Sequence, residues 1–185
     1  MYKVIDKFLD DDCFHQIASL TERVPWYFQK TIATQNDTGD NIFLMTHMFY
    51  AKNSPVSPFY EKLIPFLEKL GTDSLIRIKA NLYPNTERLH EHAMHQDFEY
   101  PNTAALLYLN TCDGYTKLKD GTKISSIANR LLIFDSSEDH CSTTTTDVPA
   151  RFNINVNYIM PPIHPTQSRF RYRMLQHPEL REFRT

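Results

Sequence analysis

Two segments of the chain alternate strictly between apolar and polar residues. In residues 76–83 and again in residues 151–158, every second side chain is apolar and the ones between are polar or charged. Successive side chains of a strand point to opposite faces, so both segments are predicted to be strands with one core face and one polar face. The polar face either meets solvent, as in many antiparallel sheets, or lines the interior of a barrel that contains a site.

The rest of the chain predicts helices near the N-terminus and strands after them. An amphipathic pattern preceded by aspartates predicts a helix over residues 11–23. Ser57-Pro58 has the form of a helix start and Gly71 that of a helix end, with an apolar run at residues 42–51 compatible with a buried strand. Short strand-like runs then continue to about residue 160. The fold class is therefore α+β and mainly β.

Composition excludes several classes of protein. With 41% hydrophobic and 12% aromatic residues among 185, the chain can bury enough apolar surface to fold, and its length fits a single domain. The 20 Lys and Arg against 22 Asp and Glu leave a net charge of −2, which does not indicate nucleic-acid binding. Three widely spaced cysteines fit a reducing compartment, and no segment has the pattern of a signal peptide or membrane span. We therefore expect a cytoplasmic protein with no membrane partner.

Two further segments have the composition of exposed chain. Residues 29–41 are polar and predict a loop long enough to be functional. Residues 161–185 form a basic extension rich in proline, with five arginines against two glutamates. Such a tail packs back on the domain, pairs subunits into a homo-oligomer, or contacts an acidic partner; contact with nucleic acid is the least favoured alternative. Within the strand region, Gly114 and Gly121 are expected to be turn residues.

The segment LHEHAMHQDFEY, residues 89–100, concentrates groups that bind metals. His95 and Asp97 lie two positions apart, so on a strand their side chains share a face. Several strand-like runs later comes His140, and then Arg151 at the start of the second alternating strand. Two imidazoles and one carboxylate form the facial triad that holds non-haem Fe(II) and leaves coordination positions open.

The order and spacing of these residues, from Arg77 to Tyr158, resemble those of the Fe(II)- and 2-oxoglutarate-dependent dioxygenases, and most of all the prolyl 4-hydroxylase-like group. The resemblance includes the runs IKANLYP, AALLYLNTCDGYTKLKDG, NRLLIFDSSEDH and RFNINVNY. It implies a double-stranded β-helix, the jelly-roll or cupin-like fold, with flanking N-terminal helices and the polar strand face inside.

The same resemblance implies a division of the chain. Residues 1–160 would be one dioxygenase domain, with helical support from residues 10–71 and a jelly-roll core from about residue 74 to 160. Residues 161–185 would be a C-terminal extension outside it.

The resemblance also implies a role for each candidate residue. His95, Asp97 and His140 would bind the catalytic Fe(II). Arg151 would pair with the distal carboxylate of 2-oxoglutarate, since its planar guanidinium forms two charge-assisted hydrogen bonds to a carboxylate. The further residues expected to contact cosubstrate or substrate, or to support those contacts, are Tyr108, Tyr83, Asn81, Asn153 and Asn155.

A competing metal site would use His90 and His92 with Asp97 or Glu99, since H-x-H resembles the first motif of cupins. It does not leave His140 and Arg151 at the spacing that the oxygenase chemistry needs, so we expect both histidines to lie on the surface or on the rim of the site. The zinc-hydrolase motif H-E-x-x-H is absent, because the second histidine is displaced by one position.

The implied reaction is hydroxylation of an unactivated C–H bond, with 2-oxoglutarate and O₂ consumed and succinate and CO₂ released. Ascorbate is expected to support full activity. The expected substrate is a prolyl residue of a peptide or protein, with residues 29–41 placed where relatives have a segment that folds over substrate. The alternatives are a free amino acid or another small metabolite as substrate, and a non-catalytic cupin-like protein that binds a metal or ligand.

Overall fold

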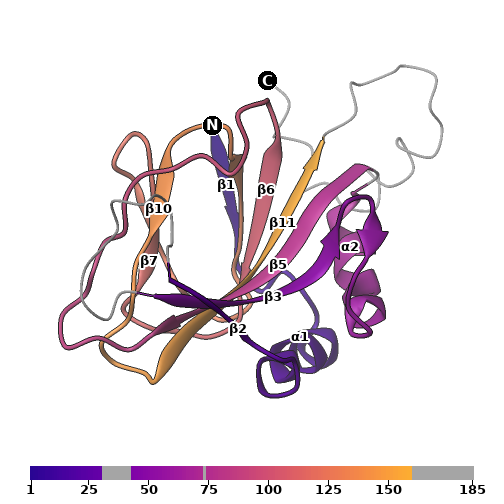
Figure 1. Ribbon diagram of the computed structural model, residues 1–185, viewed down its shortest axis with the longest axis horizontal. Coiled ribbons are helices and arrows are strands. Elements are labelled where there is room, and N and C mark those ends of the chain that lie inside the picture. Colours follow the sequence, from indigo (N-terminus) through magenta and orange to yellow (C-terminus); the bar gives the residue numbers. More distant parts are fainter. Residues whose placement is uncertain (31–42, 73, 160–185) are drawn as a thin grey trace.

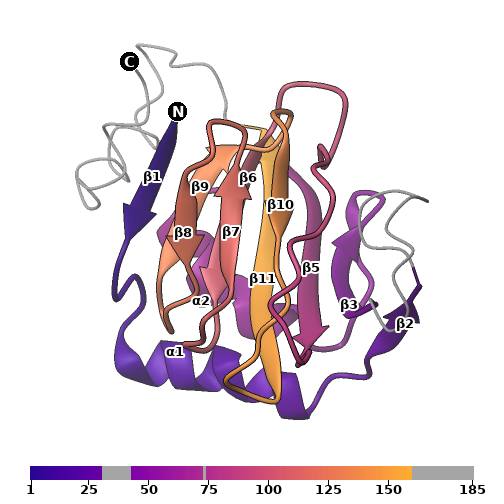
Figure 2. The same ribbon diagram turned by 90° about the vertical axis from the view of Figure 1, so that its left-hand side faces the viewer.

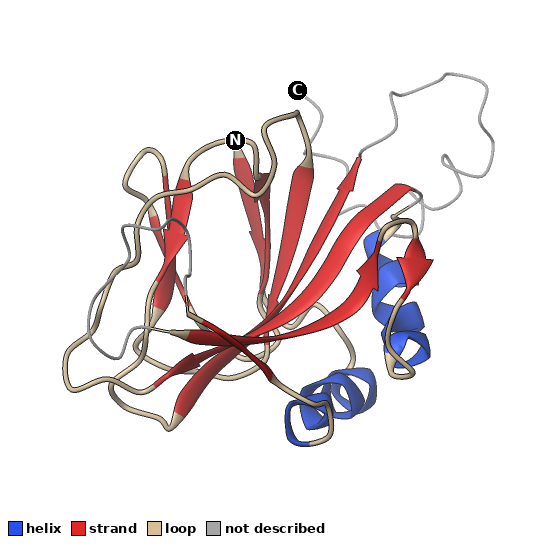
Figure 3. Cartoon of the chain, viewed as in Figure 1, coloured by secondary structure: helices blue, strands red, loops and turns tan. Residues whose placement is uncertain are grey.

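The computed structural model describes residues 1–30, 43–72 and 74–159. Two antiparallel sheets face each other, and the helices lie outside the larger one (Figures 1 and 3). The predicted loop 29–41 and the extension 161–185 fall almost entirely outside the described residues. No helix in the described part is long and apolar enough to cross a lipid bilayer.

The larger sheet has the strand order β1-β9-β6-β11-β5-β3-β2, with the short β4 paired to β3. Figure 2 shows the smaller sheet, of order β10-β7-β8, lying in front of the larger one. The strands of the larger sheet are β1 (Tyr2–Ile5), β2 (Tyr27–Gln29), β3 (Leu44–Ala51), β4 (Ser54–Pro55), β5 (Ser74–Pro84), β6 (Thr103–Tyr108), β9 (Leu131–Asp135) and β11 (Ala150–Ile159). Those of the smaller sheet are β7 (Tyr115–Leu118), β8 (Lys123–Ser125) and β10 (His140–Ser142). This is the mainly β, jelly-roll arrangement that the sequence predicts.

The predicted N-terminal helix is confirmed, although its last part is tighter than an α-helix. Helix α1 (Asp11–Ala18) is followed by a 3₁₀ turn, η1 (Ser19–Glu22). The carboxylate of Asp10 accepts a hydrogen bond from the backbone N–H of Cys13 at 2.9 Å, which satisfies one of the free donors at the helix start.

The second helix begins later than Ser57-Pro58 suggests. It starts with a 3₁₀ turn, η2 (Tyr60–Leu63), and continues as α2 (Ile64–Leu70). The hydroxyl of Ser57 instead hydrogen-bonds the ring of the buried His47 at 2.8 Å and accepts from the N–H of Phe59. Ser57, the residue expected to cap the helix, thus hydrogen-bonds His47, which is ten residues away in the sequence. The predicted end is confirmed, because Gly71 adopts the left-handed conformation at φ 73°.

The two faces of the larger sheet have different surroundings. The apolar residues of β5 and β11 pack against α1 and α2, in a cluster that includes the fully buried Ile17, Phe66, Ile78 and Ile154. The polar residues of the same strands face the smaller sheet, where Asn81, Asn153 and Asn157 are at most 3% exposed. The polar face of the alternating strands therefore lines the interior of a barrel and does not face solvent.

Candidate metal centre and its cavity

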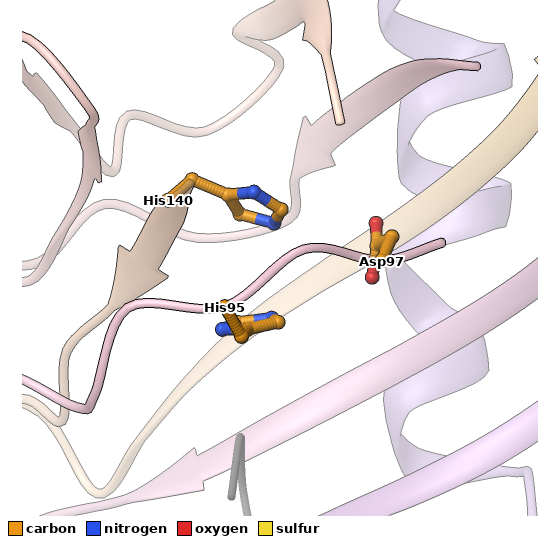
Figure 4. A group of neighbouring side chains, drawn as sticks. All are labelled: His95, Asp97 and His140. Carbon is orange, nitrogen blue, oxygen red and sulfur yellow. The ribbon is translucent and has the colours of Figure 1, made fainter. Parts of the chain in front are cut away.

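His95, Asp97 and His140 come together inside the barrel. Each offers one ligand atom, and these atoms all lie within 4.8 Å of one another. Figure 4 shows the three side chains, with His95 and Asp97 on one extended segment and His140 on β10. The segment is held to β10 because the backbones of His95 and His140 exchange hydrogen bonds in both directions, at 2.9 and 3.0 Å. The backbone N–H of Asp97 donates to the carbonyl of Ser136, directly after β9.

Both histidines have the hydrogen bonds that prepare an imidazole for a metal. Nδ1 of His140 lies 3.0 Å from the carbonyl of Glu138, and Nδ1 of His95 lies 3.4 Å from the carbonyl of Ala93. A carbonyl only accepts, so Nδ1 carries the proton and Nε2 keeps its lone pair. Burial, and next the neighbouring His140, lower the pKa of His95 to about 4, which keeps this ring neutral at pH 7.

Asp97 is held as a carboxylate from several sides. Its Oδ1 accepts from Arg77 at 2.7 Å, and its Oδ2 accepts from the side-chain amides of Asn155 and Asn157 at 3.0 and 2.8 Å. Burial by itself would raise its pKa, but Arg77, His140 and Lys79 reverse this effect and bring the pKa well below its usual value. The group therefore stays anionic, as a metal ligand must.

Arg151 is a buried cation without an acidic partner. Its side chain is fully buried, and its Nη atoms donate to the carbonyl of Thr143 at 3.2 Å and the hydroxyl of Thr116 at 3.1 Å. Its Nε has no partner, and no carboxylate in the described part of the chain pairs with it. The guanidinium lies 5.1 Å from the ring of Tyr83 and 5.5 Å from that of Tyr108. A guanidinium left in this state is a ready site for a carboxylate.

Thr116 connects Arg151 with the cavity, and the sequence analysis missed it. The hydroxyl of Tyr108 donates to the Thr116 oxygen at 2.9 Å, and that oxygen also accepts from Arg151. The Thr116 hydroxyl is therefore free to donate its own proton, and Thr116 lines the cavity that contains the three metal-binding candidates. The only signal in the sequence for the contact between Thr116 and Arg151 is the inward-facing position of Thr116 on a short strand.

The predicted asparagines line the same cavity and leave polar atoms unused. Asn81 donates to Asn153 at 2.8 Å, and Asn155 donates to Asp97. Three buried amide atoms, Oδ1 of Asn81, Nδ2 of Asn153 and Oδ1 of Asn155, have no hydrogen-bond partner among the described residues. Unpaired buried amide groups are costly, so their position around a cavity indicates contacts to a bound molecule or to water. Tyr83, also predicted, is a lining residue as well.

Lys79 is a further lining residue, on the same face of β5 as Arg77 and Asn81. The alternating pattern of residues 76–83 predicts that Lys79 lies on the polar face, but it predicts no role for it. Burial and the nearby Arg77 lower its pKa to about 8, against a smaller opposite effect of Asp97.

His90 and His92 are not part of the metal-binding group. Among the described residues, the groups able to hold a metal are His95, Asp97 and His140, and separately Cys112, Asp113 and Asp147. His92 is buried rather than on the rim, stacks on Tyr83 with ring centroids 5.5 Å apart, and hydrogen-bonds Ser142. Its pKa falls to about 3, first because of burial and second because of His90.

Gly121 is a turn residue with φ 86°, as predicted, but Gly114 has a different role. A Cβ at Gly114 would lie 2.7 Å from Cδ of Arg151 and 2.7 Å from the carbonyl oxygen of Thr144. The chain passes so close to Arg151 here that no larger side chain fits. Because Gly114 and Arg151 are far apart in the sequence, no pattern of neighbouring residues predicts their contact.

Solved structures share this fold. A prolyl hydroxylase from Trichoplax adhaerens, in complex with a hypoxia inducible factor peptide fragment, is 16% identical with a TM-score of 0.60, covering 85% of this chain and 83% of that one. A 2OG-Fe(II) oxygenase family oxidoreductase from Burkholderia pseudomallei is 14% identical with a TM-score of 0.61, covering 85% and 84%. HygX from Streptomyces hygroscopicus, with nickel and 2-oxoglutarate bound, is 11% identical with a TM-score of 0.55, covering 85% and 82%.

The chain has the fold of the 2OG-Fe(II) oxygenases. The resemblance noted in the sequence is thereby confirmed at the level of the fold. No protein-family model and no curated protein matches the chain.

Proposed function

We propose that this protein is an Fe(II)- and 2-oxoglutarate-dependent oxygenase that hydroxylates an unactivated C–H bond, releasing succinate and CO₂. The observation that carries the proposal is the pairing of two features in one barrel: a cluster of two histidines and one aspartate, and a buried arginine without an acid. The first fits Fe(II) and the second fits a dicarboxylate cosubstrate.

The donor set fits the metal. His95, Asp97 and His140 would hold Fe(II) through two neutral nitrogens and one carboxylate oxygen, the facial set that leaves positions open for other ligands. The carbonyls of Glu138 and Ala93 fix the ring tautomers, and Arg77 with two asparagines holds the Asp97 carboxylate in place. Such supporting contacts set ligand orientation and basicity.

Arg151 and Thr116, which lines the cavity, have the chemistry that a dicarboxylate cosubstrate needs. Arg151 would receive the distal carboxylate of 2-oxoglutarate, and the free proton of Thr116 would be donated to the same group. Burial raises the pKa of Tyr108, which therefore keeps the proton that it donates to Thr116. When bound, Fe(II) would activate O₂, and oxidative decarboxylation of 2-oxoglutarate would supply two of the four electrons that reduce O₂, the other two coming from the substrate C–H bond. The protein contributes orientation and a cavity shielded by Leu106 and Phe134.

For the substrate we propose a prolyl residue of a peptide. The support is the similarity in fold to a prolyl hydroxylase solved with a peptide fragment. A free amino acid or another small metabolite is the alternative that the experiment must separate from it. Retention of Asp97 supports hydroxylation, since halogenating relatives lack that carboxylate.

The experiment is succinate formation by anaerobically purified protein given Fe(II), ascorbate, 2-oxoglutarate and O₂, with and without a pool of proline-containing peptides. His140→Ala is the control. Turnover that peptides stimulate and the control lacks supports the oxygenase with a peptidyl substrate. Turnover without stimulation supports the oxygenase and points to a small molecule. Succinate at the control level under all conditions contradicts the proposal and favours a non-catalytic binding protein.

A further inference from the structure

Among the described residues, Arg77, Lys79 and Arg151 are cations on the inner side of the barrel, and they differ in the groups that they contact. Arg77 pairs with Asp97 at 2.7 Å and also donates to Asn157. Arg151 donates to Thr143 and Thr116 and lies between two aromatic rings. Lys79 makes no side-chain hydrogen bond or ion pair with any described residue, although it lines the cavity. Lys79 therefore feels the charge of Asp97 but has no direct hydrogen-bond or ion-pair partner among the described residues, and it is not assigned to the cosubstrate.

The position of Lys79 places its ammonium on the metal side of the cavity. In the sheet, Lys79 pairs in register with Asn155 of β11, whose side-chain amide binds Asp97. On the other side Lys79 pairs with Met48 of β3, which offers no charge. The side chain is half-buried, so a ligand can reach its ammonium through the cavity.

The charges of the loaded site favour an anion beside Lys79. Asp97 is the one acid among the described lining residues, and its charge is already shared between Arg77 and the metal that it would bind. Bound Fe(II) adds two positive charges and 2-oxoglutarate adds two negative ones, so Arg77, Lys79 and Arg151 leave the interior with an excess of positive charge. In a poorly hydrated cavity such an excess is costly, and an anionic group on the incoming substrate reduces it.

We propose that Lys79 is a specificity-determining residue that binds a carboxylate of the substrate next to the metal. This inference rests on the proposed function and narrows its substrate class. The carboxylate is either that of a free amino acid or that of an acidic side chain beside the target residue of a peptide. The chemistry is the same in both cases, a charge-assisted hydrogen bond from the ammonium to a carboxylate oxygen.

The test is a calorimetric titration of protein loaded with Mn(II) and 2-oxoglutarate, in carboxylate-free buffer. One arm compares the protein amino acids with their amides. The other compares capped proline tripeptides that carry Asp next to proline with the same peptides carrying Asn. Wild-type protein should bind the acid of one pair about 10- to 100-fold more tightly than its amide, the size of one charge-assisted hydrogen bond. The arm in which this preference occurs identifies the source of the carboxylate.

The variants are Lys79→Met, Lys79→Arg and Lys62→Met. Lys79→Met should lose the preference for the acid and keep its affinity for 2-oxoglutarate, while Lys79→Arg should retain much of the preference. Lys62 is an exposed lysine outside the barrel, so Lys62→Met should behave as wild type.

Three results would overturn the inference. The first is that the wild type binds acid and amide equally, or binds neither, in both arms. The second is a preference for the acid that survives in Lys79→Met. The third is a loss of 2-oxoglutarate affinity in Lys79→Met, which would assign Lys79 to the cosubstrate. Failure of the Mn(II)-loaded wild type to bind 2-oxoglutarate would instead contradict the proposed function.

Discussion

Arg77 and Arg151 lie on the inner faces of neighbouring strands, but only Arg77 has an acidic partner among the described residues. Arg77 has a carboxylate at 2.7 Å and is part of a network with Asn155 and Asn157. Arg151 is fully buried, has neutral hydrogen-bond partners, and has one unpaired N–H group. Removing a cation from water is costly unless an anion compensates it. The contrast indicates that Arg77 is paired within the chain and would support the proposed metal site, whereas Arg151 would pair with the anion of a bound molecule.

Asp97→Ala should have the largest effect, because it removes a proposed metal ligand and leaves Arg77 without its acid. We expect it to lose Mn(II) binding at concentrations that saturate the wild type, and to lose all substrate oxidation. Titration followed by the electron paramagnetic resonance of free Mn(II) measures the binding. Glu61→Ala, a change at an exposed acid, is the control. Wild-type affinity in Asp97→Ala would remove this residue from the metal site.

Arg77→Met and Arg151→Met test the comparison through stability. Arg77→Met leaves Asp97 buried without its cation, and should lower the free energy of unfolding of the metal-free protein by about 3 kcal/mol. Arg151→Met removes a cation that has no anion, so its loss should be clearly smaller. Urea unfolding of both variants measures the difference. Equal losses would mean that the two arginines play the same structural role.

Gly114→Ala tests Arg151 without changing it. The added methyl group would lie 2.7 Å from the Arg151 side chain and from a backbone oxygen, so the side chain or the strand must move. We expect a loss of about 1–3 kcal/mol in stability, typical of overpacking, and at least about tenfold weaker 2-oxoglutarate binding. Gly121→Ala, at a turn with positive φ and open space, should lose stability and keep its 2-oxoglutarate affinity. Unchanged affinity in Gly114→Ala would show that Arg151 does not bind the cosubstrate.

Acidification should destabilise the folded protein by favouring protonation of His92, which packs beside Tyr83 near Arg151. Its pKa is about 3 in the folded protein, against an ordinary value of 6.5, so the unfolded chain binds a proton that the folded chain does not. Stability is therefore complete above about pH 6.5 and falls as the pH drops toward 3. Between pH 7 and pH 5 the loss from this residue should be about 1–2 kcal/mol.

Urea unfolding of the metal-free protein at several pH values tests this prediction. His95 titrates in the same range and adds to the slope. His92→Asn should therefore show a shallower dependence on pH than wild type, without abolishing it. An identical slope in the variant would mean that His92 is protonated in the folded state.

Local patterns predicted the framework of the fold and the main candidate residues. The alternation in β5 and β11 identified both strands and the polar side chains that face the cavity. The order of His95, Asp97, His140 and Arg151 predicted the candidate metal-binding group and the candidate partner of the cosubstrate carboxylate. These signals are strong because strand periodicity and ligand chemistry are expressed within a few residues.

The features that were missed depend on contacts between distant parts of the chain. Ser57 bonds His47 instead of capping a helix, and Gly114 is small because Arg151 passes over it. Arg77 and Thr116 acquire their roles only when Asp97 and Arg151 are brought beside them. No local pattern distinguishes such residues from ordinary polar residues of a strand.

The central claim is that Arg151 binds the distal carboxylate of 2-oxoglutarate. One titration tests this claim most directly. Mn(II)-loaded wild type is titrated with 2-oxoglutarate and with 2-oxopentanoate, which has a methyl group in place of the distal carboxylate. We predict binding of 2-oxoglutarate about 100-fold tighter, the size of two charge-assisted hydrogen bonds, and a preference that disappears in Arg151→Met. Equal affinity of the wild type for the two compounds would contradict the account.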